Sequence, residues 1–293
     1  MSAAFTSSAA GAAALRALAD LLARGVPIVM LTAYDFPSAR VAIAAGVDVV
    51  LVGDSAAMTV LGYTNTRDIT VDELLMLTRA VRRAVAGSGV PLVGDLPFGS
   101  YEPSDAMAVA TAKRFVEDAG CDAVKLEGAG AMISRVRAII AAGIPVVGHV
   151  GLLPQSVVTP EGYRAKGRDV EQAVQIVRDA EALERAGCAA IIVEAVPAEV
   201  AALLSARLSV PVIGIGAGAG VNGQVLVFHD LLGLGEGRVA KFVERYADGR
   251  AALEAGARRW ADDVRARRFP AAQHTYAITP EVLAMVREKL AVS

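Results

Sequence analysis

The sequence is poor in aromatic residues, cysteine and histidine, and it lacks long apolar runs. Aromatic side chains make up 5% of the 293 residues although 54% are hydrophobic, so the core has to be built mainly from Ala, Val, Leu and Ile. No apolar run reaches the roughly 18 residues that a membrane-spanning helix needs. A chain of this length and composition can bury a large core.

The sequence also lacks an excess of charge of either sign. The formal net charge is −2, and no stripe of Lys and Arg is present. This argues against a nucleic-acid-binding or membrane-surface protein. The two cysteines, Cys121 and Cys188, lack the spacing of metal ligands, and we interpret them as reduced, buried residues of a cytoplasmic protein.

The N-terminal segment does not resemble a targeting signal. It has no basic residue before Arg16, whereas a secretory signal begins with positive charge. We expect residues 1–10 to form a loose tail and residues 12–23 to form a short amphipathic helix.

A weak repeat organises most of the chain. Several segments end a helix in Ala-Gly, continue with a short apolar run and finish on a polar residue: AAGVDVVLVGDS, DAGCDAVKLEG, AAGIPVVGHVG and RAGCAAIIVEA. Two more, SGVPLVGDLP and LSVPVIGIGAG, keep the run without the Ala-Gly. Runs of four to eight residues with little alternation indicate parallel strands that are covered on both faces.

Helical stretches separate these runs. Thr70 with Glu73 three residues later forms a capping-box pattern, and further helices are expected to begin after Ser104 and Asp169. With VPIVMLTAYD at the front and QVLVFHD at the back, eight strands alternate with helices. This order predicts a closed (β/α)8 TIM barrel. The alternative is a doubly wound open sheet, but no Gly-rich phosphate loop follows the first strand.

The predicted domain organisation is a single domain over residues 1–293. The barrel should occupy about residues 28–245, with the N-terminal helix as a cap. A C-terminal extension over about residues 246–293 should contain two helices, at about 251–267 and 280–290. These extra helices either cover the barrel or pack on a neighbouring subunit.

Polar residues stand where the predicted strands end. In a parallel barrel all of these ends open on one face, which is where barrel enzymes place their active sites. The residues expected to meet there are Asp54, Asp95, Lys125, Glu127, His149 and Glu194.

Three of these residues are carboxylates, which repel one another unless a cation lies between them. Asp54, Asp95 and Glu127 offer only oxygen donors, which suit Mg²⁺ or Mn²⁺. Each has a simpler interpretation, since Asp54 could cap the turn after it and Asp95 could cap the turn before Pro97. Their shared position favours the metal-ligand interpretation.

Lys125 and Glu127 lie two residues apart and should share the inward face of a strand. A lysine there needs an ion pair or a substrate carboxylate. His149, flanked by glycines, is a candidate substrate contact, whereas His229 could equally be structural. Glu194 ends an otherwise apolar run, so it is a candidate general acid or base; the alternative is an ion pair with a basic residue of the next strand.

The residues alone predict a metal-assisted reaction of a carbonyl compound. A divalent cation that chelates a 2-oxo acid polarises its carbonyl group, acidifies the neighbouring C–H bond and stabilises the resulting enolate. The enolate could attack an electrophile, or the reaction could run in reverse as C–C cleavage.

Ten segments between about residues 29 and 245 together resemble the ketopantoate hydroxymethyltransferase family of the phosphoenolpyruvate mutase/isocitrate lyase superfamily. They are MLTAYDFPSA, VLVGDS, VLGY, DLPFGSYE, AVKLEG, PVVGHVGLLPQSV, GYRAKGR, VEAVP, PVIGIGAG and NGQVLVFHDLLG. The resemblance implies transfer of a hydroxymethyl group from 5,10-methylenetetrahydrofolate to 3-methyl-2-oxobutanoate through a Mg-stabilised enolate, giving 2-dehydropantoate for pantothenate biosynthesis.

The resemblance also implies residue roles. Asp54 and Asp95 would bind Mg²⁺ directly, with Asp95 also close to the substrate, and Glu127 would lie near the metal. Glu194 would be the general acid/base. The substrate contacts would be Ser55, Asp95, Lys125 and His149. The family implies a homo-oligomer, often a decamer, with C-terminal helices packed on a neighbour.

The sequence departs from the family pattern at Ala56–Ala57, where Leu-Gly is usual, at Leu77 in place of a His, and at Asn222 in place of an Asp. Ala at a Gly position would restrict the loop beside the metal. Two alternatives remain: a C–C lyase or mutase of the superfamily, and a non-catalytic paralogue. Isocitrate-type lyases use a Cys in a mobile loop, whereas Cys121 and Cys188 follow Ala-Gly at strand starts.

Overall fold

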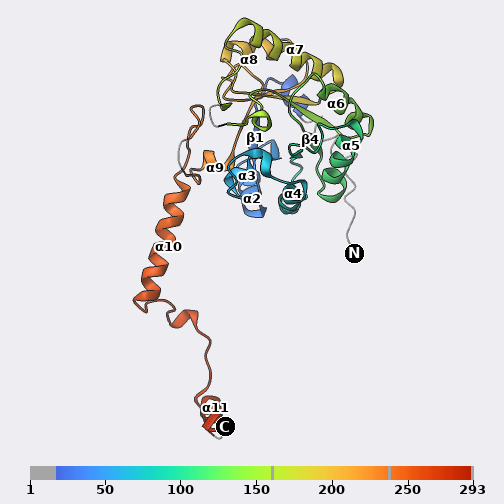
Figure 1. Ribbon diagram of the computed structural model, residues 1–293. Helices are drawn as coiled ribbons and strands as arrows, with labels where there is room; N and C mark the ends of the chain where they lie inside the picture. The colour runs from blue at the N-terminus through green and yellow to red at the C-terminus, as the bar shows by residue number, and fades with distance from the viewer. Residues whose placement is uncertain (1–17, 160–161, 237–238, 292–293) are drawn as a thin grey trace. The chain divides into compact units, whose positions relative to one another are not determined.

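A computed structural model describes residues 18–159, 162–236 and 239–291 (Figure 1). The chain forms two compact units, Met1–Tyr246 and Ala247–Ser293. In the first unit, eight parallel strands pair in chain order and close into a barrel, because β1 also pairs with β8. This confirms the predicted TIM barrel. The strands are β1 (Ile28–Thr32), β2 (Val49–Val52), β3 (Leu92–Asp95), β4 (Ala123–Lys125), β5 (Val146–Gly151), β6 (Ala190–Glu194), β7 (Val212–Ile215) and β8 (Gly223–Leu226).

Helices follow most of the strands and surround the barrel (Figure 1). They are α2 (Phe36–Ala44), α3 (Ala56–Thr59), α4 (Val71–Val85), α5 (Asp105–Lys113), α6 (Met132–Ala141), α7 (Val170–Ala186), α8 (Ala198–Ser205) and α9 (Phe228–Leu231). A π-helical turn, η2 (Arg114–Asp118), continues α5, and short 3₁₀ turns lie at η1 (Thr66–Asp68) and η3 (Pro154–Ser156).

Side-chain caps begin the long helices at the predicted residues. Thr70 and Glu73 form a reciprocal capping box at α4. Ser104 accepts a hydrogen bond from the Met107 amide at α5, and Asp169 accepts one from the Gln172 amide at α7. Each cap satisfies backbone donors that have no partner inside the helix, which fixes where the helix starts.

The core has two layers. One lies between the barrel and its helices and contains residues such as Leu74, Phe115 and Leu183. The other fills the barrel interior with the inward-pointing residues of the strands: Ile28, Met30, Val49, Leu51, Val93, Ala123, Val147, Ala190, Ile192, Ile213 and Val225.

The N-terminal helix is seen in part. Residues 18–23 are helical, and Leu18 is buried against the interior layer of the barrel. This supports the predicted cap for the described part, while residues 12–17 and the predicted tail at residues 1–10 lie outside the described residues. Among the helices that the structure describes, none combines the length and apolar character needed to cross a membrane.

The C-terminal unit contains α10 (Gly249–Arg265), a 3₁₀ turn at η5 (Ala272–His274) and α11 (Pro280–Ala291). Both helices lie close to their predicted bounds. None of the residues in α10 or α11 is buried within this chain. Their assignment to one domain with the barrel stays a prediction.

Candidate active site

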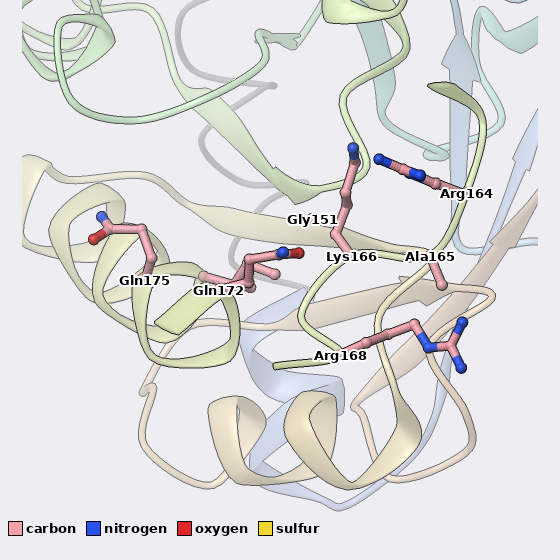
Figure 2. Close-up of a pocket in the computed structure, with 8 residues that line it drawn as sticks. Gly151, Arg164, Ala165, Lys166, Arg168, Gln172 and Gln175 are labelled. Carbon is pink, nitrogen blue, oxygen red and sulfur yellow. The ribbon is translucent and has the colours of Figure 1, made fainter. Parts of the chain in front are cut away.

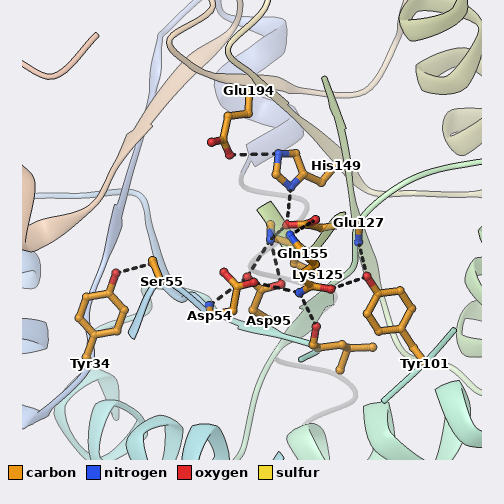
Figure 3. A network of polar contacts seen from close by, with 11 residues as sticks. Tyr34, Asp54, Ser55, Asp95, Tyr101, Lys125, Glu127, His149, Gln155 and Glu194 are labelled. Carbon is orange, nitrogen blue, oxygen red and sulfur yellow. Dashed lines mark hydrogen bonds and ion pairs between the residues drawn. The ribbon is translucent and has the colours of Figure 1, made fainter. Parts of the chain in front are cut away.

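The polar residues at the strand ends meet at one mouth of the barrel (Figure 3). Asp95 is the last residue of β3 and is the register partner of Lys125, the last residue of β4. Glu194 ends β6, and His149 lies within β5. Asp54 follows β2 by two residues, and Glu127 follows β4 by two. Parallel strands of similar length deliver these side chains to the same end, as the sequence predicted.

A continuous chain of contacts links these residues. The Asp54 backbone amide donates to Asp95 Oδ2 at 3.2 Å, and Lys125 Nζ donates to the two Asp95 oxygens at 2.7 and 2.9 Å. Lys125 Nζ also lies 3.8 Å from Glu127 Oε1. The simpler interpretations of Asp54 and Asp95 as turn caps are therefore not what the structure shows.

His149 connects two carboxylates from neighbouring strands. Its Nδ1 lies 3.4 Å from Glu127 Oε1, and its Nε2 lies 3.3 Å from Glu194 Oε2. Both are ion-pair distances without well-aligned hydrogen bonds. Glu194 thus faces a histidine of the preceding strand rather than a basic residue of the next one. Its side chain is 16% exposed, whereas that of His149 is 2% exposed.

Burial sets the electrostatics of the two aspartates. It raises the pKa of Asp54 well above the ordinary range, and the nearby charge of Asp95 raises it further. Burial also raises the pKa of Asp95, while Lys125 acts in the opposite direction. Two buried carboxylates side by side favour the binding of positive charge.

The same network keeps Lys125 and His149 cationic. Burial alone would lower the pKa of Lys125, but Asp95, Glu127 and Asp54 together raise it above its ordinary value. Burial and Lys125 both lower the pKa of His149, yet Glu127 and Glu194 outweigh them and bring it to about 9. Glu127 is affected reciprocally: burial raises its pKa, and His149 and Lys125 lower it below the ordinary value.

Two residues that the sequence analysis did not single out complete the site. The amide Nε2 of buried Gln155 donates to Asp54 Oδ2 at 3.0 Å and to the Leu96 carbonyl at 2.9 Å. Its backbone amide donates to Glu127 Oε2 at 3.0 Å, and its Oε1 accepts from the Tyr101 hydroxyl at 2.7 Å. Gln155 therefore fixes two of the proposed metal-site carboxylates at once.

Ser55 lies at the same mouth, next to Asp54. Its hydroxyl is hydrogen-bonded to the Tyr34 hydroxyl at 2.7 Å, and burial raises the pKa of Tyr34 to about 12. His229 lies in α9 and contacts the Tyr34 ring, with ring centroids 5.4 Å apart. Its Nδ1 is buried without a hydrogen-bond partner among the described residues. The ring contact places His229 beside Tyr34, and both interpretations of His229, structural and functional, stay open.

The residues at the mouth fit a Mg²⁺ ion. Asp54 and Asp95 are buried, adjacent and destabilised as anions, and Mg²⁺ is commonly held by one or two carboxylates together with substrate and water. Glu127 is engaged by Lys125, His149 and Gln155, which suits an indirect position. The described residues contain no group of three or more His, Cys, Asp and Glu arranged to hold a metal by themselves. Substrate oxygens and water would supply the remaining ligands.

The residues that depart from the family pattern are accommodated by the fold. Ala56 and Ala57 are fully buried in α3, where the backbone is right-handed, so Ala carries no conformational penalty there. Leu77 is buried in α4, on the outer layer of the core. Asn222 precedes β8, at the end of the barrel opposite the mouth, and its Oδ1 accepts from the Val212 amide and the Ser205 hydroxyl.

The cysteines lie away from the mouth. Cys121 and Cys188 precede β4 and β6 at the opposite end of the barrel, and both are buried. Burial raises the pKa of both thiols, that of Cys188 to about 12. A thiolate nucleophile at these positions is disfavoured.

Comparison with known proteins identifies the family of the chain. A family profile described as ketopantoate hydroxymethyltransferase matches residues 13–272. The 3-methyl-2-oxobutanoate hydroxymethyltransferase of Shouchella clausii (strain KSM-K16) is 49% identical over 252 residues, which cover 86% of this chain and 90% of that protein.

Solved structures share the fold at lower identity. A 2,3-dimethylmalate lyase, described as a member of the PEP mutase/isocitrate lyase superfamily, superposes with a TM-score of 0.55 at 17% identity and covers 95% of this chain and 97% of its own. A phosphonopyruvate hydrolase in complex with oxalate and Mg²⁺ gives a TM-score of 0.58 at 15% identity and covers 95% and 97%. From the family profile and the close relative, the chain belongs to the ketopantoate hydroxymethyltransferase family.

Proposed function

We propose that this protein transfers a hydroxymethyl group from 5,10-methylenetetrahydrofolate to 3-methyl-2-oxobutanoate, giving 2-dehydropantoate for pantothenate biosynthesis. The observation that carries the proposal is the buried Asp54–Asp95 pair held against Lys125, with His149 and Glu194 beside it. Membership of the family supports the same reaction.

The cationic groups suit a 2-oxo acid. Lys125 and His149 both have raised pKa values and therefore carry positive charge at neutral pH. They would attract the substrate carboxylate into a mouth that is otherwise acidic. Ser55, oriented by Tyr34, offers a further hydrogen bond to the substrate.

A Mg²⁺ ion bound by Asp54 and Asp95 would supply Lewis acidity that polarises the keto group of the substrate. Gln155 fixes the orientation of Asp54, and Lys125 fixes that of Asp95. Holding both carboxylates in place before the substrate arrives lowers the reorganisation needed during reaction.

Glu194 would move the proton. It is the most exposed of the mouth carboxylates, and its Oε2 lies beside His149 Nε2. In our proposal Glu194 takes the proton from the carbon next to the keto group, and that carbon then forms the new bond to the one-carbon unit. Overall, both C–N bonds that hold this unit to the folate break, a water molecule supplies the hydroxyl oxygen, and the two folate nitrogens take up the substrate proton and one proton of the water. The imidazolium of His149 would orient the Glu194 carboxylate towards that proton.

The test is an assay of purified protein with the oxo acid, the folate and Mg²⁺. We expect 2-dehydropantoate from the wild type and from the control Glu199→Gln, an exposed residue of α8. Asp54→Ala, Glu194→Gln and treatment with EDTA should abolish or strongly reduce it. Product formation that survives Asp54→Ala and EDTA would exclude the metal-assisted reaction.

A C–C lyase or mutase reaction is the alternative, since superfamily members with this fold include a lyase. It would be shown by cleavage of a larger oxo acid together with no hydroxymethyl transfer by the wild type. The buried, protonated cysteines at the opposite end of the barrel disfavour the isocitrate-type route.

We also propose that the protein works in the cytoplasm as a homo-oligomer, a decamer by resemblance to its family. Exposed apolar side chains of α10, namely Leu253, Trp260 and Val264, support self-association. Native mass measurement tests this, and a monomer at micromolar concentration would contradict it.

A further inference from the structure

A cavity of about 510 Å³ lies between the segment that follows η3 and the start of α7 (Figure 2). Three cationic residues line it, Arg164, Lys166 and Arg168, together with the amide side chains of Gln172 and Gln175. No described residue that lines it is acidic. The cavity therefore carries a local excess of positive charge.

These cations are available to a ligand. None of the carboxylates in the described part of the chain forms an ion pair with them. Asp169, the residue after Arg168, is engaged as the cap of α7, where it accepts from the Gln172 backbone at 2.9 Å and from the amide side chain of the same residue. In Figure 2 the head groups of Arg164 and Lys166 lie close together in the view, whereas Arg168 points away from them.

The cavity adjoins β5 and β6, the strands that carry His149 and Glu194. Its lining includes Gly151, which ends β5 two residues after His149 and is the register partner of Glu194. A Cβ on Gly151 would lie 2.3 Å from the Glu194 carbonyl oxygen, so the two backbones are packed directly together. The Lys166 backbone amide donates to the carbonyl of Ala195, the residue after Glu194, at 2.9 Å.

Within the same segment, Tyr163 comes within electrostatic range of the mouth carboxylates. Tyr163 immediately precedes Arg164, and this residue is 40% exposed. Partial burial raises the pKa of Tyr163, and the carboxylates of Asp54, Glu127 and Glu194 add to this. An aromatic side chain therefore lies within electrostatic range of the acidic mouth just before the chain reaches the cationic cavity.

We propose that the cavity binds the glutamyl carboxylates of the folate co-substrate, with Arg164 and Lys166 as the principal contacts. The inference rests on the proposed function. A folate carries its reactive one-carbon unit at the pterin end and its carboxylates at the other end of a rigid aminobenzoyl group. The one-carbon unit has to reach the mouth, where Lys125 and His149 are engaged by the carboxylate of the oxo acid and the remaining charges are carboxylates that repel a second anion. The anionic end must then lie outside the mouth, and the cavity offers the cationic partners there.

The chemistry of the cations suits this ligand. An arginine fork matches a carboxylate through two parallel hydrogen bonds, and lysine adds a mobile charge. A folate with several glutamyl residues presents one carboxylate for each added residue. We therefore expect the cavity to favour polyglutamylated over monoglutamylated folates.

The test compares the wild type, the double variant Arg164→Gln/Lys166→Gln and the control Arg178→Gln. Arg178 is an exposed residue of α7 without an ion pair among the described residues. The KM for 5,10-methylenetetrahydrofolate is measured with one and with three glutamyl residues. In the double variant we expect KM to rise roughly 3- to 10-fold, more for the triglutamate. The kcat and the KM for the oxo acid should stay within about twofold, and the effect should shrink as salt increases.

Binding of tetrahydrofolate triglutamate, measured by calorimetry, separates this inference from the proposed reaction. Wild-type protein that binds it but forms no product would contradict the reaction and not the cavity. An unchanged folate KM and affinity in the double variant would overturn the inference. So would a rise in the oxo-acid KM alone, because it would assign the cations to the other substrate.

Discussion

The interior of the barrel and its mouth are built from the same strands but have opposite chemistry. Within β3, Val93 packs in the apolar interior, and Asp95, two residues later, lies at the mouth. Within β6, Ile192 is interior and Glu194 reaches the site. Because side chains alternate with a period of two, residues two positions apart lie on the same face of a strand. That face therefore changes from apolar core to active site between one such residue and the next.

The difference separates stability from function along each strand. The interior layer gains free energy from apolar burial and needs no partner of defined geometry. The mouth buries charges, and each is tolerated only because a neighbour compensates it, as Lys125 does for Asp95. The following substitutions test this division, from the largest expected effect to the smallest.

Lys125→Met should abolish turnover and destabilise the metal-free protein by about 3–5 kcal/mol, because it leaves Asp95 buried without its cation. Val93→Ala in the adjacent strand should cost about 2 kcal/mol and leave activity measurable. Chemical unfolding in EDTA and an activity assay check both. A milder effect of Lys125→Met than of Val93→Ala on both readouts would break the comparison.

Glu194→Gln should lower kcat by about 10²- to 10⁴-fold, the usual contribution of a general acid or base. Its free energy of unfolding should change by less than about 1 kcal/mol, since the side chain is partly exposed. Ile192→Val, earlier on β6, should show the reverse pattern, with a cost of about 0.5–1.5 kcal/mol and normal kcat.

The pH dependence of stability should reveal His149. Its pKa is about 9 in the folded protein, against 6.5 for an ordinary histidine. A raised folded-state pKa contributes stability that is fully present below about pH 6.5 and is lost as pH rises through 9. In metal-free protein, the stability difference between wild type and His149→Gln should therefore shrink by up to about 3 kcal/mol between pH 6 and pH 10. A difference that stays constant over this range would show that His149 is neutral.

Gln155→Leu should weaken Mg²⁺ binding about 10- to 100-fold, because Asp54 loses the donor that orients it. The matched control Gln175→Leu, on the exposed face of α7, should leave the affinity unchanged. Calorimetric titration with Mg²⁺ measures both. Equal affinities in the two variants would show that Gln155 only supports the fold.

Asn222→Asp should have the smallest effect. A carboxylate can accept both hydrogen bonds that the Asn222 side chain accepts now, at the end of the barrel far from the chemistry. We expect a change below about 0.5 kcal/mol in the free energy of unfolding and no change in kcat. A marked loss of activity would show that the two ends are coupled.

The strands and their polar ends were predictable because periodicity and helix caps are local signals. Asp95 and Lys125 could be placed together from strand order alone. Gln155 and Tyr101 were not predictable, since both lie outside the strands and their hydrogen bonds depend on how distant loops meet. Pro154 begins the 3₁₀ turn that contains Gln155. In the sequence this proline indicates a turn, but it does not indicate which side chains the turn contacts.

The contact between Glu194 and His149 could not be predicted from the sequence. An ion pair with the next strand was the expected alternative to catalysis, but the contact runs to His149 on the preceding strand. Register between parallel strands decides which side chains face each other, and the spacing within one segment does not reveal it.

Glu194 is also the residue of the network that is most exposed to water. Asp54, Asp95, Lys125, Glu127 and His149 are each 5% exposed or less, whereas the Glu194 side chain is 16% exposed. Hydrogen isotopes inside the network should therefore exchange with bulk solvent chiefly by way of Glu194. Because Glu194 is also the proposed base, deuterium that it removes from a labelled substrate should be washed out into solvent more often than it is returned.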